Sequence, residues 1–207
     1  MEKPDITRPW EQQYRDDEVE TMPWFIPNLD HDVSRSIEML NLVPGKVLDI
    51  GAGPGTQAIA LAKLGFAVTG TDISPSAVRK ASARAKKEGV SATFICDDIL
   101  NSRLNDSFAL MIDRGCFHAI DNEQRQDYLH SVTRLLDKNG ILLLKTFHKQ
   151  ETCEEGPPNR FEADDIRAIF SSGFDVLEAR DSVFESTMDC NPKALFCVLK
   201  KHHRCRS

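Results

Sequence analysis

The sequence has no apolar run of membrane-spanning length, no Cys-x-x-Cys or His-x-x-x-His spacing, no internal repeat and no low-complexity segment. These absences exclude a transmembrane helix and argue against a resident metal. Basic residues are also in deficit, since 26 Lys and Arg stand against 32 Asp and Glu, for a formal net charge of −6. We therefore expect no membrane partner, and the charge disfavours nucleic acid.

The first residues lack the apolar core of a secretory signal, and the six cysteines do not form a spaced disulfide framework. Both features predict a cytoplasmic protein with reduced thiols, either a monomer or a weak homodimer. The length of 207 residues suits one globular domain. We expect an aromatic-rich N-terminal segment over residues 1–29 that acts as a lid or as satellite core, a main domain over 30–201 and a basic tail over 202–207.

The central stretch of the chain is Val47-Leu48-Asp49-Ile50-Gly51-Ala52-Gly53-Pro54-Gly55-Thr56. Its first four residues are typical of a buried strand, and an apolar helix pattern follows from Thr56 to Leu64. The glycines between them permit a tight turn that a ligand can approach closely. Strand, glycine turn and helix together predict one half of a nucleotide-binding fold.

Strands and helices alternate along the rest of the chain. We expect a helix capped by Asp30 or Asp32, a helix beginning at Ser74-Pro75 and a helix with an Asp121–Gln124 capping box. The pattern predicts an α/β fold with a Rossmann-like, doubly wound, seven-stranded sheet, mostly parallel with an antiparallel last strand, and helices on both faces. The expected strands cover residues 47–50, 67–72, 92–96, 108–113, 141–147, 174–183 and 194–200.

The glycine spacing distinguishes two classes of nucleotide ligand. Dinucleotide enzymes have Gly-x-Gly-x-x-Gly, but Thr56 occupies the place of the third glycine here, and Gly55 comes one residue early. Asp72 ends the second strand 21 residues after Gly51, where a carboxylate can accept both ribose hydroxyls. With Val-Thr-Gly-Thr-Asp-Ile-Ser, the stretch resembles class I S-adenosylmethionine-dependent methyltransferases. The resemblance implies an enzyme that uses S-adenosyl-L-methionine as its cofactor.

The ends of the strands supply the candidate cofactor contacts. Gly51 and Gly53 are expected beside the methionine part, with Asp49 orienting its ammonium group. Asp72 is expected at the ribose, although it could instead cap the next helix, and Ile73 at the adenine. The resemblance implies that Asp98 accepts from the adenine amino group, with Asp97 as its competitor, and that the Ile99 N–H approaches a ring nitrogen. Further candidate cofactor contacts are Trp24, covering the bound molecule, and Asp113.

The residues after the fourth strand narrow the resemblance. Asp113-Arg114-Gly115-x-x-His118, with Trp10-x-x-x-Tyr14 and Pro23-Trp24, is similar to the small-molecule branch near thiopurine, thiol and tellurite-resistance methyltransferases. The candidate substrate contacts are Trp10, Phe25, Cys116 and Phe117. Phe25 departs from the family pattern, which often has an acid at that position.

Methyl transfer from a sulfonium needs few side chains, because the leaving group is already good and alignment supplies much of the rate. A thiolate acceptor needs no base, whereas an amine or hydroxyl acceptor must lose a proton. His118 is the candidate base, with a structural role as the alternative.

Three other functions remain open at this stage: a non-catalytic cofactor-binding domain that acts through a protein partner, a methyltransferase for proteins, and one for a metalloid. The metalloid hypothesis would require Cys116, Cys153 and Cys190 to converge. We expect a small-molecule acceptor whose identity the sequence does not reveal.

Overall fold

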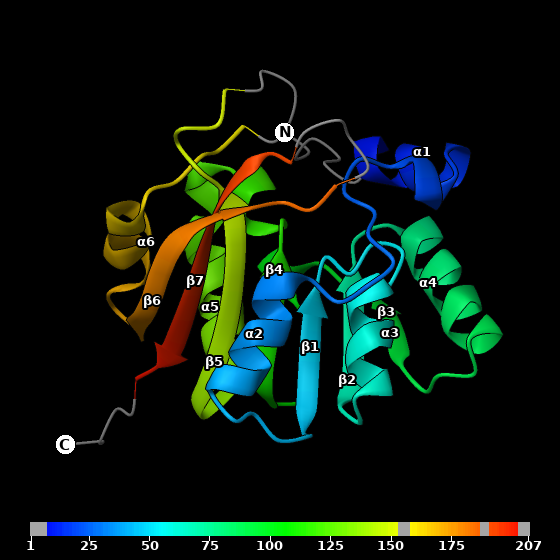
Figure 1. Ribbon diagram of the computed structural model, residues 1–207, viewed down its shortest axis with the longest axis horizontal. Coiled ribbons are helices and arrows are strands. Elements are labelled where there is room, and N and C mark those ends of the chain that lie inside the picture. Colours follow the sequence, from blue (N-terminus) through cyan, green and yellow to red (C-terminus); the bar gives the residue numbers. More distant parts are fainter. Residues whose placement is uncertain (1–7, 153–157, 187–190, 203–207) are drawn as a thin grey trace.

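The computed structural model describes residues 8–152, 158–186 and 191–202. Its seven strands form one sheet in the order β3-β2-β1-β4-β5-β7-β6 (Figure 1). The strands are β1 (Lys46–Ile50), β2 (Ala67–Asp72), β3 (Thr93–Cys96), β4 (Phe108–Arg114), β5 (Leu136–Phe147), β6 (Phe174–Val183) and β7 (Lys193–Lys201).

The pairing confirms the expected sheet. β1 to β5 pair in parallel, and β7 runs antiparallel between β5 and the edge strand β6. The strand order reverses between β1 and β4, where Ile50 lies opposite Asp113. In an open α/β sheet, ligands bind outside the carboxyl ends of the strands at such a switch point. The glycine turn and the residues after β4 therefore meet at one edge.

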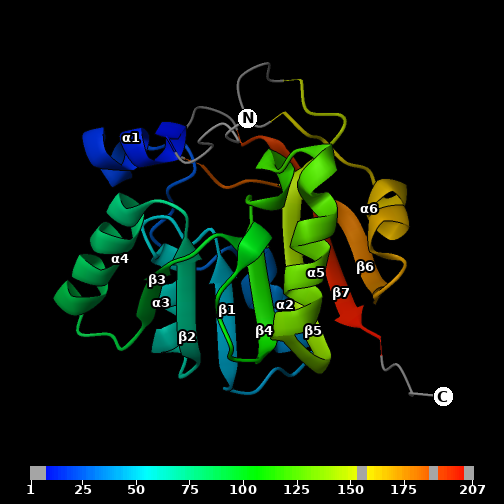
Figure 2. The ribbon, with the colours of Figure 1, turned by 180° about the vertical axis from the view of Figure 1, so that it is seen from behind.

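Helices cover both faces of the sheet, as expected. α2 (His31–Met39) and α3 (Thr56–Lys63) lie on one face, while α5 (Arg125–Leu135) and α6 (Ala163–Phe170) lie on the other (Figure 2). α4 (Pro75–Lys87) flanks β2 and β3. Each face has its own apolar core, since Val33 and Leu61 pack on one side and Tyr128 and Phe170 on the other. Burying these large side chains stabilises each layer by about 1.5–3 kcal/mol per side chain.

Two local predictions about the chain near α5 need correction. The expected capping box fails because Asp121 precedes a 3₁₀ turn, η4 (Asn122–Gln124), without a side-chain cap, and α5 begins only at Arg125. The fifth strand begins earlier than expected, at Leu136, and the residues before Ile141 bulge out of its pairing with β4. The Asn139-Gly140 turn is therefore an irregularity within β5.

Asp30 proves to be the N-cap of α2, as one of the two expected alternatives, because its side chain accepts a hydrogen bond from the Asp32 N–H at 3.0 Å. None of the helices in the described ranges has the length and apolar character needed to span a bilayer.

The N-terminal segment contains α1 (Arg8–Asp16) and the 3₁₀ turn η1 (Val19–Thr21), and it crosses the end of α4 (Figure 1). Tyr14, Met22 and Phe25 form a small apolar cluster with Ala77 of α4. The aromatic residues of the segment thus dock on the chain's own main domain, near the carboxyl edge of the sheet.

Candidate active site

The glycine turn has the geometry that its sequence predicts. Gly51 and Gly53 have φ values of 64° and 51°, in the left-handed region that favours glycine. A Cβ on Gly53 would stand 2.5 Å from the Tyr14 hydroxyl oxygen, and one on Gly51 would stand 3.0 Å from the Cys116 Cβ. Side chains from two distant segments therefore pack directly against the turn, and any larger residue at either position would displace them.

Asp72 connects the glycine turn to the start of α4. One carboxylate oxygen accepts from the Gly53 N–H and the other from the Ser74 N–H, both at 2.9 Å. Burial raises the pKa of this carboxyl to about 6, although the backbone hydrogen bonds oppose the rise. Ser74 in turn caps α4 through its hydroxyl, at 3.0 Å from the Ala77 nitrogen. Asp72 thus stabilises the turn, and each of its oxygens can accept a further hydrogen bond.

Asp49 is a buried acid with one oxygen that lacks a partner. It is 2% exposed, and its Oδ2 has no hydrogen-bond partner among the described residues. Burial raises the pKa of Asp49 to about 7, and the nearby Asp113 and Asp72 carboxylates contribute to the rise. Because an unpartnered carboxylate is costly inside a protein, a cation beside Asp49 would be strongly favoured. An ammonium group fits this position.

Asp113 holds the loop that follows β4. Its carboxylate accepts from the Tyr128 hydroxyl at 2.8 Å, from the Cys116 N–H at 2.7 Å and from the N–H groups of Gly115 and Phe117. Its described contacts are therefore with the protein, which favours a positioning role over the expected cofactor contact. Burial raises the pKa of the Cys116 thiol well above its ordinary value, so this cysteine is a neutral packing residue against the glycine turn.

Two predicted substrate contacts are buried in apolar clusters. Phe117 is 0% exposed and packs in the α5–α6 core against Tyr128 and Phe161, with ring centroids at 4.9 and 5.3 Å. Phe25 packs against α4, with the Arg84 guanidinium 5.1 Å from its ring centroid. Burial argues against both contacts, because the chain geometry places these rings in apolar clusters, which sequence spacing does not reveal.

His118 lies at the site but is poorly suited to act as a base. Its Nδ1 accepts from the Phe147 N–H at 3.2 Å, and its ring packs against Phe147 and Phe184. Burial, with a further effect of the Arg114 charge, lowers the pKa of His118 to about 3. The ring is therefore neutral at physiological pH, and its proton lies on Nε2, because Nδ1 is already an acceptor. This arrangement favours the structural role.

The neutral state of His118 leads to a kinetic prediction. Replacing a true general base costs about 10²–10⁴-fold in rate. We expect His118→Gln to retain turnover within about tenfold of the wild type and to leave the pH–rate profile between pH 5 and 8 unchanged. A loss of a hundredfold or more, with a vanished ionisation, would contradict the structural role; thermal unfolding of the same variant is the control for misfolding.

The two acids after β3 both make hydrogen bonds within the chain. Asp98 caps the 3₁₀ turn η2 (Ile99–Asn101) through a 2.9 Å bond from the Leu100 N–H. Asp97 accepts from the Arg103 N–H, while its buried Oδ2 has no hydrogen-bond partner in the described part of the chain. Asp98 is half-buried and Asp97 is buried, so the Asp98 carboxylate is the more accessible of the two to a ligand. Ile73 is also half-buried, and Ile99 is a core residue.

One N-terminal residue that the candidate contacts did not include, Tyr14, lies against the glycine turn. The Tyr14 hydroxyl contacts the glycine turn and accepts from the Trp24 indole N–H at 3.1 Å. Trp24 packs edge-to-face on Trp10, with ring centroids at 5.8 Å. The Trp10-x-x-x-Tyr14 spacing signals that both rings share one helix face, but only the fold shows that this face meets Gly53.

Glu11 was also missed, and it docks α1 on α4. Its carboxylate accepts from the Ser74 and Ser76 hydroxyls at 2.6 and 2.7 Å and from the Ser76 N–H at 2.9 Å. The hydrogen bond from Ser74 is the main reason why the pKa of Glu11 falls to about 2. The acceptor stays charged at neutral pH, next to the positive end of the α4 dipole.

We expect Glu11→Gln to loosen the N-terminal segment, because an amide makes weaker bonds to the α4 amino end. Limited proteolysis within residues 8–29 should become faster, while added S-adenosylhomocysteine should slow it in the wild type. Glu20→Gln is the matched control, because Glu20 is an exposed residue of the N-terminal segment and pairs with Arg84, which belongs to α4. Equal cleavage in all samples, with and without the ligand, would leave the segment as ordinary satellite core.

A buried charge cluster lies beneath the carboxyl ends of β4 and β5. Asp30 is 0% exposed and pairs with Arg114 at 2.7 Å and with Lys145 at 2.9 Å. Lys145 also pairs with Asp32 at 2.7 Å, and Asp32 pairs with Arg180 at 2.5 Å. Burial by itself would raise the pKa of Asp30, but the two cations outweigh it and hold that pKa below its usual value. The cluster joins α2, β4, β5 and β6 under the site.

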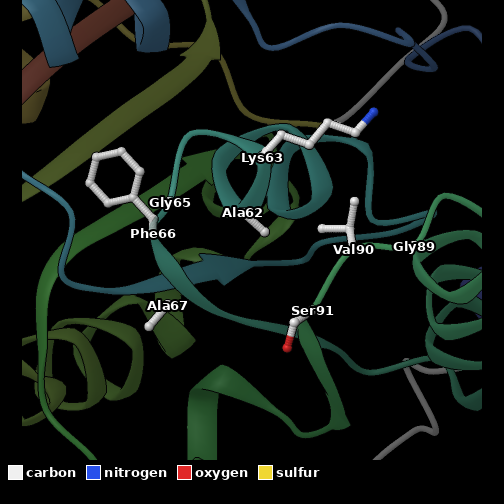
Figure 3. A pocket seen from close by; sticks show the side chains of 8 residues that line it. All are labelled: Ala62, Lys63, Gly65, Phe66, Ala67, Gly89, Val90 and Ser91. Atoms are coloured by element: carbon white, nitrogen blue, oxygen red, sulfur yellow. The ribbon is translucent and has the colours of Figure 1, made fainter.

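The metalloid hypothesis gains no support here. Cys153 and Cys190 lie outside the described residues, and the residues that are described contain no group of three or more His, Cys, Asp or Glu that could hold a metal. A shallow hollow of about 520 Å³ lies near the ends of α3 and α4, lined by Lys63, Phe66 and Val90 among others (Figure 3). It adjoins the start of β2, at the opposite end of the sheet from the glycine turn, so it is separate from the candidate site.

The chain is similar in sequence to known methyltransferases. The family profile described as thiopurine S-methyltransferase matches residues 6–205. Human EEF1A lysine methyltransferase 2 is 37% identical over 143 residues, covering 64% of this chain and 55% of the relative. The chain thus spans about half the length of the first curated relatives it matches. A 2-heptyl-1-hydroxyquinolin-4(1H)-one methyltransferase from Mycobacteroides abscessus is 31% identical over 68% of this chain and 64% of its own.

Among solved structures, an S-adenosylmethionine-dependent methyltransferase from Anabaena variabilis superposes with a TM-score of 0.76 over 98% of both chains, at 24% identity. This likeness shows the same fold over the whole chain.

Proposed function

The chain belongs to the thiopurine S-methyltransferase family, and from that premise we propose that it methylates a small-molecule acceptor in the cytoplasm. It is an S-adenosyl-L-methionine-dependent methyltransferase. The acceptor, its accepting atom, the cellular location and the roles of individual residues are our proposals.

The glycine turn with its two acids carries the assignment of the cofactor site. Asp49 Oδ2, buried without a partner among the described residues, suits the ammonium group of the cofactor. Asp72 has two buried oxygens, each with capacity for a ribose hydroxyl beyond its backbone bond. Gly51 and Gly53 give the turn its left-handed backbone, and Tyr14 and Cys116 pack against the sides where a Cβ would stand. The bound cofactor supplies a methyl group on a sulfonium, which is an intrinsically good leaving group.

We assign further cofactor contacts by position. Tyr14 accepts from Trp24 and retains its own hydroxyl proton, so it can donate to the carboxylate of the cofactor beside Gly53. Trp24 covers this side of the site. Asp98, with Ile73 and the Ile99 backbone nearby, serves the adenine. These roles use hydrogen bonds and packing alone, with no proton transferred.

The enclosure of the site supports a small acceptor. The N-terminal segment and the connection after β6 meet over the carboxyl ends of β4 and β5, where Arg114 binds the carbonyls of both Trp24 and Glu185. His118, Phe147 and Phe184 form an aromatic wall beside them. Trp10 packs on Trp24 in the N-terminal segment, and Cys116 packs on Gly51 from the loop after β4; we keep both as candidate contacts of the acceptor. Two segments that meet over the strand ends in this way would exclude water and favour a small acceptor.

None of the described side chains at this position is suited to act as a base. We therefore favour an acceptor that loses its proton without help from a side chain. His118 is neutral with its Nδ1 occupied, and Asp113 is saturated by backbone and tyrosine donors. A thiol with an ordinary pKa provides its own nucleophile, because a fraction is thiolate at neutral pH. We therefore propose a small thiol as the acceptor class. The chain's contribution is alignment, which is worth up to about 7–11 kcal/mol.

A protein acceptor is the second candidate, because the human relative is named a lysine methyltransferase. The deciding experiment incubates the chain with methyl-labelled cofactor and, in parallel, a panel of small thiols, amines and phenols or a desalted protein extract. Label in small thiols supports the proposal. Label confined to protein, with none in any small molecule, contradicts it.

A further inference from the structure

Arg114 lies where the two segments above the site meet. It is the last residue of β4, and its side chain is 7% exposed. Its Nε donates to Asp30 Oδ2 at 2.7 Å, its Nη1 to the Trp24 carbonyl at 3.2 Å and its Nη2 to the Glu185 carbonyl at 2.8 Å. One guanidinium therefore binds the main domain, the N-terminal segment and the connection after β6.

The contacts continue from Trp24 to the cofactor turn. The Trp24 indole donates to the Tyr14 hydroxyl, and that hydroxyl packs directly on Gly53. An uninterrupted series of contacts thus runs from Glu185 through Arg114, Trp24 and Tyr14 to the glycine turn. Its one end lies over the acceptor side of the site and its other end at the cofactor.

We propose that Arg114 is a positioning residue that couples cofactor binding to the placement of residues 184–186, directly after β6, beside the acceptor. The inference rests on the proposed cofactor site at the glycine turn. A ligand beside the glycine turn that contacts Tyr14 and Trp24 stabilises the position of the N-terminal segment seen here. That position holds the Trp24 carbonyl on the guanidinium, whose planar fork has only one orientation that also reaches Glu185. The coupling is reciprocal, so an acceptor that orders residues 184–186 would tighten cofactor binding by the same factor.

The surroundings of Arg114 keep it in place whichever segment is bound. Asp30 neutralises its charge, and the Phe184 ring lies 5.4 Å from the guanidinium carbon. Its bonds to the two segments use main-chain oxygens, so they depend on where the backbone lies and not on a particular side chain. Arg180 belongs to the same charge cluster but bonds to Asp32 and Glu178 instead, and stacks over Phe196.

That difference supplies the matched control. Arg114→Lys keeps the charge beside Asp30 but loses the planar fork, whereas Arg180→Lys makes the same chemical change elsewhere in the cluster. Amide hydrogen exchange is measured for residues 19–26 and 184–186, with and without saturating S-adenosylhomocysteine. In the wild type and in Arg180→Lys, we expect the ligand to slow exchange at least about fivefold in both segments. In Arg114→Lys, only residues 19–26 should be protected.

Three outcomes overturn the coupling: no protection of 184–186 in the wild type, full protection in Arg114→Lys, or an equal loss in Arg180→Lys. A second variant, Tyr14→Phe, removes the hydroxyl that accepts from Trp24 and leaves the charge cluster intact. Compared at a ligand concentration that calorimetry shows to saturate the variant, it tests the same series if Arg114→Lys folds poorly. We expect it to reduce the protection of 184–186 as well, and unchanged protection would contradict the inference. Calorimetry on the wild type separates the two levels, because absence of S-adenosylhomocysteine binding would refute the proposed cofactor site itself.

Discussion

Asp72→Ala should lower the affinity for S-adenosylhomocysteine at least about tenfold. A hydrogen bond to a charged group is worth about 1.5–3 kcal/mol, and the proposed site uses Asp72 for two hydroxyls. The structure adds a second consequence. Asp72 also accepts from the buried N–H groups of Gly53 and Ser74, and each unsatisfied donor costs about 1–3 kcal/mol. The variant should therefore also unfold at a lower temperature.

Asp97→Asn separates these two effects. Asp97 and Asp72 are both 7% exposed. Asp97 directly follows β3, as Asp72 ends β2, and it also accepts a hydrogen bond from a backbone N–H, that of Arg103. We expect Asp97→Asn to lower the stability of the fold, while its affinity for S-adenosylhomocysteine stays within about threefold of the wild type. Calorimetric titration is carried out at a temperature where all variants are folded. Unchanged affinity in Asp72→Ala would refute the assignment of Asp72 to the ribose.

Asp30→Asn should reduce the free energy of unfolding by about 3–5 kcal/mol, because removing one partner of a buried ion pair leaves uncompensated charge. The amide preserves the shape of Asp30 and its cap on α2, but Arg114 and Lys145 lose their shared counter-charge. Urea unfolding measures the loss. Asp106→Asn is the control, since Asp106 forms an exposed pair with Lys46 whose side chains are both 60% exposed. Exposed pairs contribute about 0–1 kcal/mol.

The contribution of Asp30 should depend on pH in a defined direction. Its folded pKa is lowered by Lys145 and Arg114 against the effect of burial. A carboxyl with a lowered folded pKa stabilises the protein above its unfolded pKa of about 3.9, and the effect disappears as pH falls through the folded value. The difference between the wild type and Asp30→Asn should therefore be full at pH 7 and shrink below about pH 4. A constant difference across this range would contradict the charge explanation.

The sequence by itself determined the architecture and the glycine turn. Short apolar runs and helical apolar patterns, with glycines at the turns, are local signals that predicted the strands within a few residues, and their alternation predicted the mostly parallel sheet. The turn at Gly51 and Gly53, with Asp49 before it and Asp72 at the end of the next strand, was also readable, because these residues are fixed by backbone geometry within one βαβ unit.

Only the tertiary structure decided how distant segments meet over that unit. The docking of Glu11 on Ser74, the contact of Tyr14 with Gly53 and the pairing of Asp30 with Arg114 join residues that are far apart in the chain. Phe117 and His118 follow a strand end, yet the packing of α5 and β5 buries one in the core and neutralises the other. The position and charge of such side chains depend on burial and on partners brought together by long-range contacts, which a local pattern does not encode.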